Sequence, residues 1–170
     1  RIRGKFRMKG LRTTNPISVG DHVIFEDEES EGRGVIKEIE ARKNYIIRKS
    51  VNLSKEAHIV ASNVDQAFLF ATVKLPRTSA GFIDRFLVTA EAYSIKAIVV
   101  FNKIDLLDEE EKEELNFLVK TYESVGYDVR QISAETGEGT QELYDELAGK
   151  TNMLTGHSGV GKSTFINKTN

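Results

Sequence analysis

Apolar residues from position 64 onward follow two alternating patterns. Short continuous apolar runs predict buried strands, and longer stretches with an apolar residue every three or four positions predict amphipathic helices. The predicted strands are 67–73, 97–101, 129–132 and 152–155, and the predicted helices are 82–93, 109–125, 141–148 and one beginning near 162. Because alternating strands and helices form a mostly parallel sheet with helices on both faces, we expect an α/β domain over residues 64–170.

Residues 1–63 have a different pattern, without a helical period. Short runs of strand-forming residues are separated by turn signals such as Asn15-Pro16, Gly20-Asp21 and Lys43-Asn44. The predicted strands are 2–8, 22–26, 34–39, 45–48 and 59–61. Five short strands suit a small all-β barrel of the oligonucleotide-binding (OB-fold) type, so we expect two domains, 1–63 and 64–170.

Charge divides the chain at the same place. Residues 1–63 carry 13 basic and 9 acidic side chains, a net charge of +4, whereas residues 64–170 carry 11 basic and 17 acidic side chains, a net charge of −6. This asymmetry indicates a basic module that binds polyanions, joined to an acidic module with a different function.

Composition excludes several kinds of protein. The chain has no cysteine, so it holds neither a disulfide framework nor a thiolate zinc site. The longest apolar run, 97–101, is far too short to span a bilayer, and the charged start lacks the apolar core of a signal peptide. We therefore expect a cytoplasmic protein with no membrane partner.

Four basic residues alternate near the start of the chain: Arg3, Lys5, Arg7 and Lys9. On a strand these side chains would all point to one side and form a surface for the phosphates of RNA. A solvated face that only confers solubility is an equally good interpretation of the charge alone. Phe6 and Phe25 could stack on bases, but we expect core positions for aromatic residues on half-buried strands.

A phosphate-binding pattern, G-x-x-x-x-G-K-[ST], follows the predicted strand 152–155. It reads Gly156-His157-Ser158-Gly159-Val160-Gly161-Lys162-Ser163-Thr164. The glycines let backbone N–H groups approach phosphate oxygens, and the next helix adds the positive end of its dipole. Lys162 would reach the β- and γ-phosphates, and the Ser163 hydroxyl would bind Mg²⁺. Because His157 occupies a variable position, we expect a spacer there rather than a catalytic base.

Two further segments follow predicted strands. They are Asn102-Lys103-Ile104-Asp105, after strand 97–101, and Ser133-Ala134, after strand 129–132. Because the carboxyl ends of parallel strands lie along one edge of a sheet, where ligands bind, we expect both segments beside the phosphate loop. Alone, the first segment could be a turn capped by Asp105, but together the three segments favour a nucleotide site.

The residue types in these segments predict guanine as the base. The Asp105 carboxylate can accept from N1–H and the exocyclic amine of guanine, and adenine offers no such pair of donors. Asn102 would donate to the opposite edge and tie the loops together, and the alkyl stem of Lys103 would lie over the ring. The backbone N–H near Ala134 would donate to guanine O6. We therefore expect GTP or GDP rather than ATP as the ligand.

The base-reading segments precede the phosphate loop, which reverses the order of ordinary GTPases. A circular permutation explains this order without changing the site, so we interpret residues 64–170 as part of a P-loop GTPase domain with permuted motif order. Together with Gly4-Lys5-Phe6-Arg7 and Val19-Gly20-Asp21 in the basic module, these motifs make the whole chain resemble the ribosome small-subunit-dependent GTPase A family.

The resemblance implies a GTP-hydrolysing factor in late maturation of the 30S ribosomal subunit, stimulated by that subunit. It implies Mg²⁺ as a cofactor and contact of the amino-terminal barrel with 16S ribosomal RNA, and we expect a monomer. The family continues beyond the phosphate loop with switch segments, an Asp-x-x-Gly motif and zinc ligands. None of these can be assigned here, so we expect a truncated chain in which the catalytic residue that orients water is unknown.

Two other functions fit part of the sequence. One is an RNA-binding module whose nucleotide domain senses GTP without hydrolysing it. The other is an ATP-using kinase or transporter subunit, against which Asp105 argues because it suits guanine.

Overall fold

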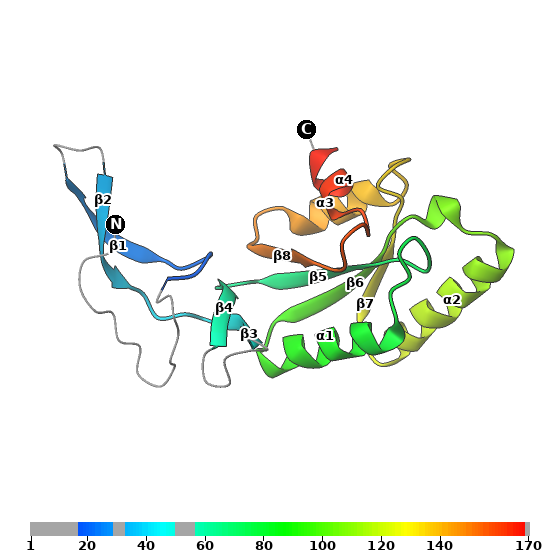
Figure 1. Cartoon of the computed structure of the whole chain (residues 1–170), viewed down its shortest axis with the longest axis horizontal. Coiled ribbons are helices and arrows are strands. Elements are labelled where there is room, and N and C mark those ends of the chain that lie inside the picture. Colours follow the sequence, from blue (N-terminus) through cyan, green and yellow to red (C-terminus); the bar gives the residue numbers. More distant parts are fainter. Residues whose placement is uncertain (1–16, 29–32, 50–56, 169–170) are drawn as a thin grey trace. The chain divides into compact units, whose positions relative to one another are not determined.

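The computed structural model describes residues 17–28, 33–49 and 57–168 of the chain (Figure 1). The chain divides into two units, Arg1–Val64 and Asp65–Asn170. Each unit is described separately below.

The first unit contains two antiparallel hairpins among its described residues. Their strands are β1 (Val23–Glu28) with β2 (Arg33–Ile39), and β3 (Tyr45–Lys49) with β4 (Ala57–Ser62). These strands agree with four of the predicted ones to within about two residues at each end. The fifth predicted strand, 2–8, lies outside the described residues. The described strands pair only as two separate two-stranded sheets, so the five-stranded barrel is not confirmed.

One expectation for this unit is wrong. Phe25 was expected in the core, but 57% of its surface is exposed. Its ring lies over Gly34 of the neighbouring strand, where an added Cβ would come within 2.9 Å of a ring carbon. The absence of a side chain at Gly34 gives the ring a flat backbone surface to cover.

A buried carboxylate joins the ends of both hairpins. Arg42 donates from Nε and Nη2 to the two oxygens of Asp21 at 2.6 Å each, Ser62 Oγ donates at 2.5 Å, and the Ser18 N–H donates at 2.8 Å. Burial by itself would raise the pKa of Asp21, but these hydrogen bonds outweigh it and hold the pKa below its usual value. Because Asp21 precedes β1, Arg42 follows β2 and Ser62 ends β4, the cluster fixes the hairpin ends together.

We predict that acid destabilises the first unit through Asp21. Since its pKa is lower in the folded state, its contribution to stability is complete above the unfolded pKa of about 3.9 and is lost as the pH falls through the folded pKa. Asp21→Asn should lower the free energy of unfolding by about 2 kcal/mol at pH 7 and weaken the decline on acidification. Unfolding curves of the full-length protein from pH 7 to pH 2.5 test this, with the exposed Glu40→Gln as control. An equal acid decline in both variants would contradict it.

The second unit is a four-stranded parallel sheet with the order β7-β6-β5-β8. Its strands are β5 (Gln66–Ala71), β6 (Lys96–Phe101), β7 (Asp128–Gln131) and β8 (Asn152–Thr155). Its helices are α1 (Ala80–Ala92), η1 (Ile104–Leu106, a 3₁₀ turn), α2 (Glu109–Ser124), α3 (Thr140–Leu147) and α4 (Lys162–Asn167). The predicted α/β architecture is therefore confirmed.

Strand β5 ends two residues earlier than predicted. Thr72 leaves the sheet because its N–H donates to Thr78 Oγ1 at 3.1 Å, and the Thr78 N–H donates back to the Thr72 carbonyl at 2.9 Å. These bonds close the loop between β5 and α1.

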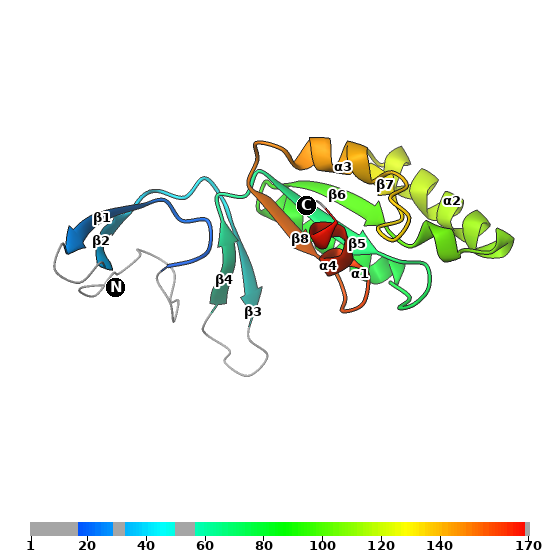
Figure 2. The ribbon, with the colours of Figure 1, turned by 90° about the horizontal axis from the view of Figure 1, so that it is seen from above.

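Helices cover both faces of the sheet (Figures 1 and 2). One face packs against α1 and α2 through a core that includes Leu69, Val99, Ile83, Leu87, Leu115 and Val119. The other packs against α3 and α4 through a core that includes Phe68, Phe70, Ile98, Val100, Leu143 and Phe165. Alternate residues of β5 and β6 thus serve opposite cores, which is why both strands are continuously apolar.

The glutamates at the start of α2 have a structural role. Asp108 accepts from the Glu111 N–H at 2.9 Å, and the Glu111 carboxylate accepts from the Asp108 N–H at 2.9 Å, which forms a capping box. This negative charge also lies where the helix dipole favours it. Among the described residues, no helix is both long and apolar enough to cross a membrane.

Candidate functional site

The three predicted segments lie at one edge of the parallel sheet. Asn102 directly follows β6, Ile132 to Ala134 follow β7, and the phosphate loop follows β8. Because these strands are parallel, their carboxyl ends point to the same edge (Figure 1). The fold therefore brings together segments that are far apart in sequence, from Asn102 to Thr164.

The amide of Asn102 joins all three segments. Asn102 is buried, and its Nδ2 donates to the carbonyl of Val160 in the phosphate loop at 2.8 Å. Its Oδ1 accepts from the backbone N–H of Ala134 at 2.9 Å. One side chain after β6 thus holds the loops after β7 and β8 in fixed positions.

The Ala134 N–H differs from its predicted role in this structure. The sequence suggested an N–H near this residue as a donor to guanine O6, but the Ala134 N–H donates to Asn102 Oδ1. The preceding Ser133 is fully buried, and its hydroxyl accepts from the Thr136 N–H at 3.1 Å. Ser133 therefore stabilises the conformation of the loop after β7 through this hydrogen bond.

Two glycines of the phosphate loop allow close approaches that no other residue permits. Gly161 has φ of 96°, and an added Cβ would come within 2.2 Å of Asn102 Nδ2. Gly156 has φ of 138°, and an added Cβ would lie 2.3 Å from the Phe70 carbonyl. A side chain at either position would push the loop away from Asn102 or from β5.

Lys162 lies at the mouth of the phosphate loop. Its ammonium donates to the carbonyls of Gly156 at 2.9 Å and His157 at 2.8 Å. An ammonium has three N–H donors, so one remains for a ligand oxygen. Val160 is fully buried and packs in the core beside α4, which anchors the loop, whereas Ser158 and Ser163 are exposed.

The base-reading segment leaves β6 through a left-handed residue. Lys103 has φ of 65°, and its Nζ donates to the carbonyl of Leu75 at 2.5 Å. The Ile104 N–H donates to the Ile132 carbonyl at 3.3 Å, and the Ile104 side chain packs on the core beside α1 and α2. Ile104 is thus a packing residue, and Asp105 beside it is exposed.

A cavity of about 210 Å³ collects residues from all three segments. It is lined by Asn102, Lys103, Asp105, Leu106, Ala134, Glu135, Gly161 and Thr164. Sequence reasoning missed Leu106 and Glu135, which lie next to predicted residues and lack a motif of their own. All three loops and the exposed Asp105 carboxylate line this cavity, and these are the features that recognition of a base requires.

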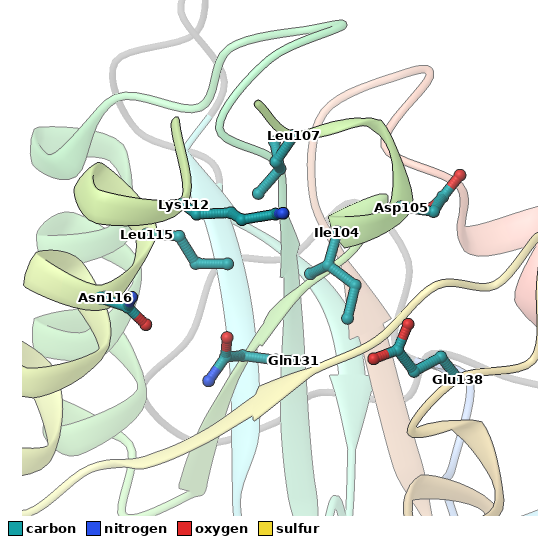
Figure 3. A pocket seen from close by; sticks show the side chains of 8 residues that line it. All are labelled: Ile104, Asp105, Leu107, Lys112, Leu115, Asn116, Gln131 and Glu138. Carbon is teal, nitrogen blue, oxygen red and sulfur yellow. The ribbon is translucent and has the colours of Figure 1, made fainter. Parts of the chain in front are cut away.

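A larger cavity of about 440 Å³ lies on the other side of η1 (Figure 3). It is lined by Ile104, Asp105, Leu107, Lys112, Leu115, Asn116, Gln131 and Glu138. In Figure 3 the carboxylate of Asp105 points away from Leu115 and Lys112. No residue of the phosphate loop lines this cavity, so its size does not make it the nucleotide site.

His157 makes a contact that the sequence did not predict. Its exposed ring stacks on Phe82, near the start of α1, with ring centroids 4.0 Å apart and an angle of 30° between the planes. Leu75 and Pro76, in the connection between β5 and α1, also reach the loops of the site. No sequence motif marks these residues, and Phe82 was predicted only as the first residue of the helix 82–93.

Two further predictions concern the binding of RNA and of Mg²⁺. The predicted RNA-binding residues Arg3, Lys5, Arg7 and Lys9 lie outside the described residues. Within the described part of the chain, no cluster of three or more acidic or histidine side chains could hold a metal ion by itself. Ser163 thus offers a single hydroxyl for Mg²⁺.

Comparisons with known proteins agree with this geometry. The structure of YjeQ from Thermotoga maritima is 39% identical, with a TM-score of 0.77 over 100% of this chain and 55% of that one. YloQ, described as a circularly permuted GTPase, is 33% identical, with a TM-score of 0.65 over 95% of this chain and 53% of that one. The permuted order of motifs seen here is therefore compatible with a known fold.

Curated relatives point the same way. The small ribosomal subunit biogenesis GTPase RsgA of Christiangramia forsetii is 54% identical, over 98% of this chain and 54% of the relative. The protein of the same name from Flavobacterium johnsoniae is 53% identical, over 98% of this chain and 52% of the relative. This chain thus spans about half the length of those relatives. A model of the RsgA GTPase family matches residues 39–170, and the chain belongs to that family.

Proposed function

We propose that this chain is the nucleotide-binding part of a GTP-hydrolysing factor that acts in late maturation of the 30S ribosomal subunit. The observation that carries the proposal is the Asn102 amide, which holds the phosphate loop and the loop after β7 against the base-reading segment. Relatives named for biogenesis of the small ribosomal subunit support the biological role.

The base would occupy the smaller cavity. Asp105 would accept from N1–H and the amine of guanine, and the stem of Lys103, held through its bond to Leu75, would cover one ring face. Because the Ala134 N–H itself donates to Asn102, a neighbouring backbone N–H of the same loop would donate to guanine O6. Adenine would leave the Asp105 carboxylate without donors, so GTP and GDP are the ligands.

The phosphates would lie in the loop from Gly156 to Thr164. Its backbone amides and the third N–H of Lys162 supply positive charge, and the Ser163 hydroxyl fits Mg²⁺ whose other ligands are phosphate oxygens and water. Phosphoryl transfer depends mainly on positioning and charge neutralisation, which these groups provide. The residue that orients the attacking water is not assigned in this chain.

The amino-terminal module would hold the factor on the ribosome. Residues 1–63 are proposed as an OB-fold domain that binds 16S ribosomal RNA through Arg3, Lys5, Arg7 and Lys9, and residues 64–170 as the permuted GTPase domain. Such a factor would work in the cytoplasm as a monomer. The zinc module expected from the family has no cysteine ligands in this chain.

Phosphate release tests the proposed function. The full-length protein should hydrolyse GTP slowly alone and faster with purified 30S subunits, with 50S subunits as the control. GTP binding without turnover in the presence of 30S subunits would favour instead an RNA-binding module that senses GTP.

A further inference from the structure

The connection between β5 and α1 together with the first turn of α1, which we call the β5–α1 segment (Thr72–Phe82), contacts both nucleotide motifs. The carbonyl of Leu75 accepts from Lys103 of the base-reading segment at 2.5 Å. The Pro76 ring lies 3.5 Å from the position that a Cβ would take at Gly159 of the phosphate loop. One segment outside the known motifs therefore touches both halves of the site.

A further contact of this segment is the ring pair of Phe82 and His157. Phe82 is half-buried and packs against the core that α1 and α2 share, which restrains its ring. The His157 ring is exposed, and it lies against the Phe82 ring at a centroid distance of 4.0 Å, with the two planes inclined by 30°. An imidazole that would otherwise move freely in water is thus held by an anchored aromatic ring.

The contact between Phe82 and His157 affects Lys162, the residue that would bind phosphate. The carbonyl of His157 accepts from Lys162 Nζ at 2.8 Å, so the position of His157 determines where that ammonium lies. We propose that Phe82 is a positioning residue for nucleotide binding, which acts through His157 on Lys162. This inference rests on the proposed function of the phosphate loop.

The expected effect on GDP binding follows from the fraction of molecules in which the phosphate loop holds Lys162 in its binding position. Without the stack, the His157 end of the loop would sample positions in which Lys162 is misplaced, and apparent affinity falls in proportion to the competent fraction. Aromatic pairs of this kind correspond to a change of about 2- to 10-fold in an equilibrium constant. Phe82→Leu should therefore weaken GDP binding about 2- to 10-fold.

A matched control separates positioning from packing. Phe86 lies one turn further along α1 and packs on the same core, whereas the ring that pairs with His157 is that of Phe82. In the full-length protein, Phe82→Leu and Phe86→Leu should lower the melting temperature similarly, while only Phe82→Leu weakens binding of fluorescent GDP. Phe82→Tyr, which keeps a ring, should restore the affinity.

A double-mutant cycle tests the route through His157. His157→Ala changes an exposed side chain, so it leaves the fold intact and should weaken GDP binding as much as Phe82→Leu does. The double variant should bind no more weakly than either single one. Wild-type affinity in His157→Ala, or fully additive effects, would overturn the inference while leaving the proposed function standing. Failure of the wild-type protein to bind GDP would overturn both.

Discussion

Replacing Lys162 by alanine should weaken binding of GTP and GDP by at least about 100-fold. The ammonium uses two of its N–H groups on the carbonyls of Gly156 and His157, which leaves the third for a phosphate oxygen. A charge-assisted bond to phosphate in this position is among the strongest single contacts available to the site. Titration of the full-length protein with fluorescent GDP measures the loss.

The control for this variant is another lysine. Lys120→Ala removes an exposed ammonium from α2, away from the phosphate loop, and should leave GDP affinity unchanged. RNA affinity should persist in both variants, because it is assigned to the amino-terminal module. If Lys162→Ala bound GDP as tightly as the wild type, the assignment of the phosphate loop would be wrong.

Replacing Asp105 by asparagine should change the preferred base from guanine to xanthine. The carboxylate accepts from two guanine donors, whereas the amide of asparagine can donate to the O2 that xanthine carries. A site built for hydrogen bonding rejects a ligand that leaves its groups unpaired, so GDP affinity should fall about 100-fold and xanthosine diphosphate should bind more tightly than GDP.

Competition between the two nucleotides on the full-length variant measures this change. Asp145→Asn, an exposed position on α3, is the matched control and should keep the preference for guanine. Were Asp105→Asn to keep that preference too, Asp105 would not contact the base.

Local sequence patterns predicted the second unit well. Apolar runs in β5 and β6 and the helical spacing in α1 and α2 reflect burial, which is a property of neighbouring residues. The meeting of Asn102 with the two other loops was also predictable, because parallel strands end at one edge.

Contacts between distant side chains were not predictable in this way. Nothing around Phe82 indicates that it meets His157, 75 positions later, and the bond of Lys103 to Leu75 depends on how the β5–α1 segment folds back. The Asp21 cluster likewise joins residues that no periodicity connects. The position of Phe25 was predicted wrongly because alternation on a strand does not say which face is covered.

The most direct test of a guanine nucleotide site at this edge is a competition experiment. The full-length protein would be loaded with fluorescent GDP in the presence of Mg²⁺, and unlabelled GTP or ATP would be added. We predict that GTP displaces the label at concentrations similar to those of unlabelled GDP and that ATP does not displace it even in large excess. Displacement by ATP as readily as by GTP would contradict base recognition by Asp105 and the site described here.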